Sequence, residues 1–220
     1  MQSTRFAALF SFVAILGLAG CCCNQPAQES KSAAAPAAPT GEPDMQLPPG
    51  WTPQDMQAYA DAATPGPMHA HLTQGVGTWT GTSTSWMAPG TEGTKSTTKS
   101  VVTSVMDGKF VQVDVSGDML GLGPFHGMGF NGYDNVTKKF ISSWIDNMGT
   151  TMMTGTGELS PNGKSLTWTY TYSCPINKRP TIMREVETST GPNSMTLEMF
   201  GADPKTGVEY KMMQIDMTRK

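Results

Sequence analysis

Two histidines close together in the chain are the first residues whose type suggests a metal ligand. His69 and His71 flank Ala70, and side chains at this spacing share a face on a strand but not on a helix. A zinc site takes about four ligands, and no matching cysteine or carboxylate lies near them in the sequence. We therefore expect no metal site here and interpret both histidines as surface or capping residues.

Methionine is unusually frequent, with 17 residues in the chain. Thioethers suit the soft ion Cu(I), and Met152-Met153 and Met212-Met213 are adjacent pairs. Neighbours on a strand point to opposite faces, so neither pair alone forms one site. Methionine also fills core gaps and lines adaptable surfaces. This pattern favours an apolar pocket lined by methionine over a copper site.

A glycine motif, Gly127-Met128-Gly129-Phe130-Asn131-Gly132, matches the spacing of dinucleotide-binding loops. That fingerprint needs a helix starting within it, whereas here the glycines lead into a hairpin. We reject the nucleotide interpretation. Glycines in a strand more often permit a sharp bend or the close approach of another chain segment.

Motifs of common hydrolases and redox enzymes are missing from the sequence, which has no G-x-S-x-G, H-E-x-x-H or C-x-x-C. Carboxylates do occur in expected strands, at Asp146 and in Glu185-Val186-Glu187. The alternation of outward-facing residues accounts for them, so we expect them to face solvent. We assign no catalytic residue, no metal and no cofactor, and an enzyme ranks third among the functions considered.

Three cysteines follow an apolar N-terminal run. Arg5 precedes the run from Phe6 to Leu18, which is shorter than the roughly 20 residues of a membrane span and is typical of a secretory signal. The sequence Leu18-Ala19-Gly20-Cys21 resembles the bacterial lipobox. This resemblance implies cleavage after residue 20, a diacylglyceryl group on Cys21, and further acylation, for example by palmitate.

We therefore expect a signal peptide over residues 1–20 and a cell-envelope lipoprotein anchored to the membrane through lipid on Cys21. The alternative is an ordinary secretory signal that leaves a soluble protein. Cys22, where the enteric sorting rule would place Asp for inner-membrane retention, favours the periplasmic side of the outer membrane. Cys22 and Cys23 are further acylation sites or exposed thiols, and adjacent cysteines rarely form a disulfide.

The rest of the composition limits the partners. The net charge of −3 argues against a nucleic-acid partner, which would need a basic patch. Residues 21–46 are rich in Ala and Pro and predict a disordered tether after the lipidated cysteine. Cys174 is the single cysteine beyond this tether, so the folded part has no internal disulfide framework.

The elements that follow are a short helix and many strands. In residues 47–74 we expect a helical strap that Thr52 caps and Pro53 starts. From residue 75 to residue 220 the chain alternates about ten strands with turn signals such as Asp107-Gly108 and Asn162-Gly163. Closure removes exposed edges, so the pattern predicts an all-β protein, an antiparallel up-and-down β-barrel. The alternative is a flattened or half-open barrel with a helical plug.

Several long stretches resemble one bacterial family. They are PGPMHAHLTQGVGTWTGTSTSWM, GMGFNGYDNVTKKFISSWIDNMGT and EYKMMQIDMTRK, and the resemblance extends from about Gly66 to Lys220. The family is domain of unknown function 1579, which implies a lipocalin-like, calycin-type barrel and implies no reaction or ligand.

The segment Gly77-Thr78-Trp79 also resembles the Gly-x-Trp opening of lipocalins and of nitrobindin-like haem barrels. This resemblance implies that Gly77 and Trp79 close one end of the barrel, with Trp79 packed under a basic residue. Nitrobindin-like proteins bind haem through a late histidine, and no histidine follows His126 here. We therefore do not expect haem.

The interior of such a barrel would draw on alternate residues of each strand. In KKFISSWIDNM the inward pair is either Phe140 with Trp144 or Ile141 with Ile145, and both choices are apolar. Our candidates for residues that line a ligand pocket are Trp86, Phe130, Trp144, Met152 and Trp168.

These features predict that the barrel binds a small apolar or amphipathic ligand without catalysis. The alternative is a structural or stress-related interaction module whose barrel is filled by its own side chains. A continuous apolar cavity favours the first, and two close, buried carboxylates would favour an enzyme. The sequence does not fix the ligand or the oligomeric state.

Overall fold

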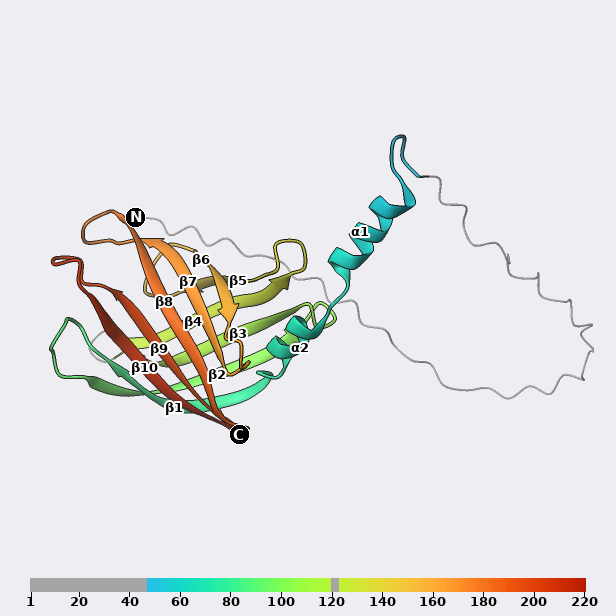
Figure 1. Ribbon diagram of the computed structural model, residues 1–220. Coiled ribbons are helices and arrows are strands. Elements are labelled where there is room, and N and C mark those ends of the chain that lie inside the picture. The colour runs from blue at the N-terminus through green and yellow to red at the C-terminus, as the bar shows by residue number, and fades with distance from the viewer. Residues whose placement is uncertain (1–46, 120–122) are drawn as a thin grey trace, which may run out of the picture. The chain divides into compact units, whose positions relative to one another are not determined.

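Ten antiparallel strands form a closed barrel in the computed structural model, which describes residues 47–119 and 123–220 (Figure 1). Each strand pairs with its neighbours in the chain, and β1 pairs with β10 to close the sheet. The predicted fold class, an all-β up-and-down barrel, is confirmed. The expected signal peptide and tether lie outside the described residues. The strands are β1 (Gly77–Ser85), β2 (Thr94–Val105), β3 (Phe110–Met119), β4 (Gly123–Asp134), β5 (Lys139–Asp146), β6 (Met153–Leu159), β7 (Ser165–Ser173), β8 (Pro180–Gly191), β9 (Ser194–Ala202) and β10 (Glu209–Arg219).

Two predicted turns have the backbone geometry that their sequences favour. Asp107 and Gly108 have φ values of 57° and 82° between β2 and β3, in the left-handed region that Gly and Asp tolerate best. Between β6 and β7, Gly163 has a φ of 69° and the Asn162 side chain accepts a hydrogen bond from the Lys164 amide at 3.0 Å. Local chemistry therefore specifies where these hairpins reverse.

Two helices precede the barrel. Helix α1 (Pro53–Ala63) begins after Thr52, which forms a capping box with Asp55. None of its residues is buried. Its C-terminal carbonyls accept hydrogen bonds from the side chain of Asn135 in the β4–β5 turn, the shortest being 2.8 Å to the Thr64 oxygen. This helix does not contribute to the core.

Helix α2 (Pro67–Thr73) packs against one end of the barrel, near β3 and β4 (Figure 1). Its Leu72 is buried in a core cluster with Val111, Phe140 and Leu166. We call this end the α2 end. We call the end opposite α2 the open end.

The register shows which alternate residues face inward. The fully buried Trp168 lies opposite Gly157 on one side and Glu185 on the other. The same alternation on β5 turns Phe140 and Trp144 inward and leaves the other pair outside. Aromatic side chains thus occupy the barrel interior, as a small barrel requires.

Candidate functional site

Two glutamates lie inside the barrel, next to its largest buried side chain. Glu185 and Glu187 on β8 are opposite Trp168 and Leu166 of β7, both of which are buried core residues. Glu185 is only 7% exposed. The expectation that these carboxylates face solvent was wrong. Val186 takes the outward position instead, so here the apolar residue of the alternation is on the outer face.

The two carboxyl groups are neighbours on the inward face of β8 and influence each other's protonation. Burial raises the pKa of Glu185 well above its usual range, and the adjacent charge of Glu187 raises it further. Burial also raises the pKa of Glu187, while hydrogen bonds from Trp168 and Glu185 act in the opposite direction. The Trp168 Nε1–H donates to Glu187 Oε1 at 2.9 Å. Burial therefore favours the protonated form of this pair.

A hydroxyl chain lies beside this pair. The Ser142 hydroxyl donates to Asn131 Oδ1 at 2.7 Å and lies 3.0 Å from the Tyr170 hydroxyl. Since the serine proton is already used, Tyr170 is the donor of the second bond. Burial raises the pKa of Tyr170 above its ordinary value, and the charge of Glu185 adds to this effect. Tyr170 therefore remains a neutral donor.

Glycines on neighbouring strands make room for the inward-facing rings. A Cβ at Gly155 would lie 2.7 Å from Tyr170 Cδ1, and one at Gly157 would lie 2.7 Å from Trp168 Cε3. On β4, the Trp144 ring covers both Gly127 and Gly129. The glycine motif rejected as a nucleotide loop thus lies in a strand and permits close approach of an aromatic ring.

The open end has its own inward-facing tryptophan and acid. Trp144 Nε1–H donates to Asp146 Oδ2 at 3.0 Å, and Met153 lies opposite Trp144 on β6. These residues, with Val115 at an inward-facing position of β3, are only partly buried. The walls near this end are therefore mainly apolar and accessible.

The predicted lining residues divide into two groups. Trp144 and Trp168 face inward. Phe130 and Met152 lie on the outer surface, 43% and 62% exposed, because Phe130 has the opposite parity to Gly129 and Met152 precedes the inward Met153. Neither lines the interior, so these two predictions are wrong.

Trp86 lies at the rim of the open end, just after β1. Its ring is 5.7 Å from the Lys211 ammonium, which pairs with Glu198 at 2.8 Å on the outer face of β9. Trp86 and Lys211, together with Pro89 and Tyr210, line a small hollow of about 210 Å³. Trp86 therefore contacts the outside of the barrel and not its interior, so its prediction as a lining residue is wrong as well.

Gly77 and Trp79 lie at the α2 end. The guanidinium of Arg219 is 4.6 Å from the centre of the Trp79 ring, and the indole N–H donates to the Gly75 carbonyl at 2.8 Å. Gly77 has a φ of 140° and packs against the Arg219 side chain, which also donates to the Gln74 carbonyl at 2.6 Å. The tryptophan is thus packed under a base at the start of β1.

The histidines of α2 have packing roles. His69 is buried and accepts a hydrogen bond from the Gly66 amide at 3.0 Å. His71 contacts Phe140 edge-on, and burial lowers the pKa of its imidazole. No group of three or more metal-ligating side chains occurs within residues 47–119 and 123–220.

One methionine pair differs from the expected alternation. Met212 and Met213 both pack against core clusters, because a β-bulge shifts the register between Lys211 and Met213. Met212 also fills the space beside Gly201. Both side chains therefore add apolar surface to the barrel interior.

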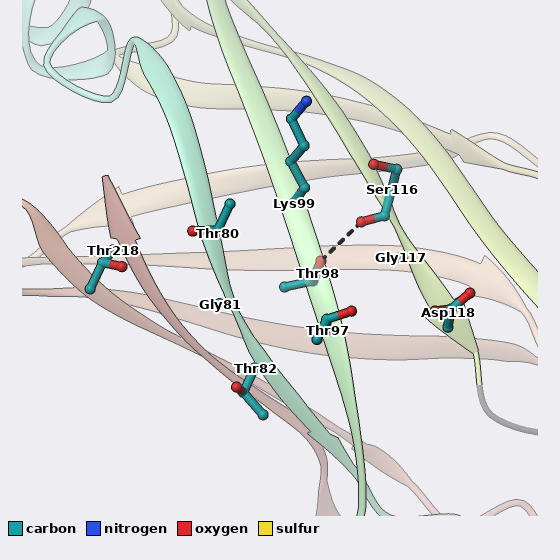
Figure 2. A pocket seen from close by; sticks show the side chains of 10 residues that line it. All are labelled: Thr80, Gly81, Thr82, Thr97, Thr98, Lys99, Ser116, Gly117, Asp118 and Thr218. Carbon is teal, nitrogen blue, oxygen red and sulfur yellow. Dashed lines mark hydrogen bonds between the residues drawn. The ribbon is translucent and has the colours of Figure 1, made fainter. Parts of the chain in front are cut away.

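A larger hollow of about 670 Å³ lies on the outer face, where Figure 2 shows its lining residues from β10, β1, β2 and β3. Hydroxyl groups dominate its lining, for example those of Thr80, Thr97 and Ser116, and its charged side chains are Lys99 and Asp118. It has no aromatic or long aliphatic wall. This surface does not suit an apolar ligand.

The inner site is chemically suited to hold a hydrogen-bond donor or to exchange a proton. The pair presents carboxyl oxygens beside aromatic faces, and in the described chain no nucleophilic side chain hydrogen-bonds to either carboxyl group. Among the described helices, none has the length and apolar character needed to cross a membrane.

Three comparisons with known proteins are informative. The structure resembles that of Rv2717c from M. tuberculosis, with a TM-score of 0.55 and 13% sequence identity over 71% of this chain and 99% of that chain, which supports the barrel fold alone. A second structure, EF1p2_mFAP2b bound to DFHBI, covers 70% of this chain and 99% of its own at 14% identity. Its TM-score of 0.38 is too low for an inference.

No curated protein matches the sequence. The sequence profile of a family described as "Protein of unknown function (DUF1579)" matches residues 64–219. This match covers β1 to β10 and α2, which is most of the described chain. The chain therefore belongs to the DUF1579 family.

Proposed function

We propose that this protein binds a small amphipathic molecule inside its barrel and that the molecule enters from the open end. The supporting observation is the unequal filling of the interior. Phe140 and Trp168 are buried, whereas Val115, Trp144 and Met153 toward the open end remain partly exposed. Ligand sites are mostly apolar with a few polar groups that fix orientation, and the acid pair would supply such groups.

We further propose that the protein is a cell-envelope lipoprotein, held by lipid on Cys21 at the periplasmic side of the outer membrane. The support is the sequence around the cysteine, Leu18-Ala19-Gly20-Cys21. Two or more acyl chains make an anchor stable where one is marginal. A lipid anchor would place the barrel where amphipathic molecules are concentrated.

Native mass spectrometry tests the binding proposal. The full chain carrying Cys21→Ser, which removes the proposed lipidation site, is purified without detergent and measured before and after denaturation. A discrete added mass that is lost on denaturation supports binding and reports the ligand class. A bare protein mass, repeated after incubation with single-chain amphiphiles of different charge, would contradict the proposal.

Incorporation of labelled palmitate or glycerol tests the anchor. We expect label on the wild-type protein, no label on Cys21→Ser, and transfer of that variant to the soluble fraction. Cys22→Ser is the matched control and should remain attached to the membrane. Equal labelling of Cys21→Ser and the wild type would exclude Cys21 as the anchor.

A second candidate, an interaction module, is favoured by apolar side chains on the outer face of β4 and β5. Phe130, Ile141 and Ile145 are 43%, 37% and 44% exposed and lie on adjacent strands. In this case the barrel interior would serve stability only. A bare mass in the experiment above, with loss of partner binding in Phe130→Ser, would favour this alternative.

A further inference from the structure

The acid pair inside the barrel has no basic partner among the described residues. By register, the inward-facing positions of the ten strands carry three acids, Asp146, Glu185 and Glu187, and one base, Arg219. Arg219 lies at the α2 end, where Trp79 and backbone carbonyls hold its guanidinium. The register therefore places no base opposite the acid pair.

The ion pairs of the described chain all lie elsewhere, on the outer face. They are Lys139–Glu158, Arg184–Glu209 and Lys211–Glu198. Of the interior acids, Asp146 already accepts hydrogen bonds from the Trp144 indole and the Met148 amide. Glu185 is only 7% exposed. Outside the acid pair, no described residue forms a hydrogen bond or an ion pair with its carboxyl group.

Such an arrangement costs stability, because burying a carboxylate without a cation or several donors is unfavourable. The hydrogen bond from the Trp168 N–H to Glu187 reduces this cost only for that carboxyl group. Groups that are poorly compensated in the free protein often complete their hydrogen bonds with a ligand. A ligand that carries donors and a positive charge would satisfy both carboxyl groups.

The surroundings of the pair also suit a cation. The rings of Trp168 and Tyr170 are stacked, with their centres 6.2 Å apart, and Glu185 is opposite Met199 on the neighbouring strand. Aromatic faces attract ammonium groups through their negative quadrupole. The apolar wall toward the open end would contact the remainder of the ligand.

We propose that the ligand is a cationic amphiphile, an apolar chain or ring with a protonated amine that donates hydrogen bonds to the carboxyl groups of Glu185 and Glu187. This inference rests on the proposed binding of a ligand in the barrel. A fatty acid anion would instead meet a like charge at the same position. An alcohol of equal length would gain only a neutral hydrogen bond, which is weaker.

Isothermal titration of the full chain carrying Cys21→Ser, with decylamine, decanol and decanoate below their aggregation concentrations, tests the inference. We expect decylamine to bind at least about tenfold more tightly than the other two, because a charge-assisted hydrogen bond in a buried site has this magnitude. Glu185→Gln and Glu187→Gln should each weaken decylamine binding about tenfold and leave decanol binding unchanged. Glu158→Gln, on the outer face of β6, is the matched control.

Three other outcomes are distinguishable. Equal binding of all three compounds, or unchanged decylamine binding in both glutamine variants, would overturn the cationic ligand and leave the proposed binding function standing. Binding of none of them would overturn both. Thermal unfolding of each variant shows whether it is folded. If a glutamine variant does not fold, the relative affinities of the three compounds for the chain with both glutamates intact still test the inference.

Discussion

Two tryptophans occupy the barrel interior in the same way but in different surroundings. Trp168 packs over Gly157 and donates to Glu187, and Trp144 packs over Gly127 and donates to Asp146. We call these sets of three the inner unit and the outer unit. Each combines a strand glycine, a large ring and an acid.

The two units differ in what covers the ring. Phe140 and Tyr170 flank Trp168, which is fully buried, whereas Trp144 is only half-buried. The same combination of glycine, ring and acid is therefore part of a packed core near α2 and of a partly exposed wall near the open end. The degree to which side chains fill the interior, and not the strand geometry, therefore distinguishes the two halves of the barrel.

Truncation of the rings should separate the two units most strongly. We expect Trp168→Ala to lower the free energy of unfolding by about 3–5 kcal/mol, because it removes a fully buried ring and leaves a cavity. Trp144→Ala should cost less than half as much, since solvent already reaches its ring. Chemical denaturation of both variants measures the difference, and equal losses would contradict the division into two halves.

Replacing the glycines of the two units with alanine should again destabilise the inner unit more than the outer unit, by a smaller amount. A Cβ at Gly157 would lie 2.7 Å from the Trp168 ring and 3.0 Å from Phe140 Cβ, so Gly157→Ala should cost about 1–3 kcal/mol. At Gly127 the half-buried Trp144 ring can shift, and Gly127→Ala should cost less. Gly149→Ala, whose added Cβ would lie 4.0 Å from the Thr151 amide nitrogen, its nearest neighbour, is the control in the same denaturation experiment. A smaller loss of unfolding free energy for Gly157→Ala than for Gly127→Ala would contradict the conclusion that the inner unit is the more tightly packed.

Glu185, which lies beside the inner unit, should make stability depend on pH. The pKa of Glu185 is raised in the folded state, so the folded protein binds more protons than the unfolded chain. Stability from this group is fully present below the unfolded pKa, near 4, and is lost as pH rises toward the folded pKa, with a slope of at most about 1.4 kcal/mol per pH unit.

We expect Glu185→Gln to flatten this decline in melting curves recorded between pH 5 and 8, and the exposed Glu158→Gln to leave it intact. Asp55, Asp134 and Asp203 have lowered pKa values, so their contributions are lost as pH falls below about 4 and lie outside this window. An unchanged slope of stability against pH in Glu185→Gln would show that Glu185 does not bind the extra proton.

Removal of one buried hydroxyl should have the smallest effect. Tyr170→Phe loses the hydrogen bond to Ser142, and we expect a cost of about 1 kcal/mol. Tyr172→Phe removes a hydroxyl that makes no hydrogen bond to the described residues, and its stability should be unchanged. Equal unfolding midpoints for the two variants would show that the hydroxyl chain contributes nothing to the inner half.

Much of the fold could be predicted because its signals are local. Asp107-Gly108 and Asn162-Gly163 favour positive φ, and Thr52 with Pro53 starts a helix. These preferences act within a few residues and need no knowledge of the rest of the chain. The count of about ten strands follows from the spacing of such turns.

The candidate site could be predicted only in part. Trp144 and Trp168 face the interior as predicted, but Trp86, Phe130 and Met152 lie outside it, and the acid pair was missed. In SLTWTYTYS, the alternation of threonines with aromatic residues was the signal that Trp168 and Tyr170 face the interior. No comparable signal existed for Glu185, because Val186 beside it is the more apolar residue.

Sequence alone therefore established the number of strands, their turns and the expectation of closure, because turn residues and β-propensity act at short range. The tertiary structure was needed to show which alternate residues face inward, because a shift of one residue exchanges the two faces of a strand without changing its composition. It was also needed to bring Glu185 beside Glu187, Trp168 and Tyr170, since cross-strand register and burial together create that environment.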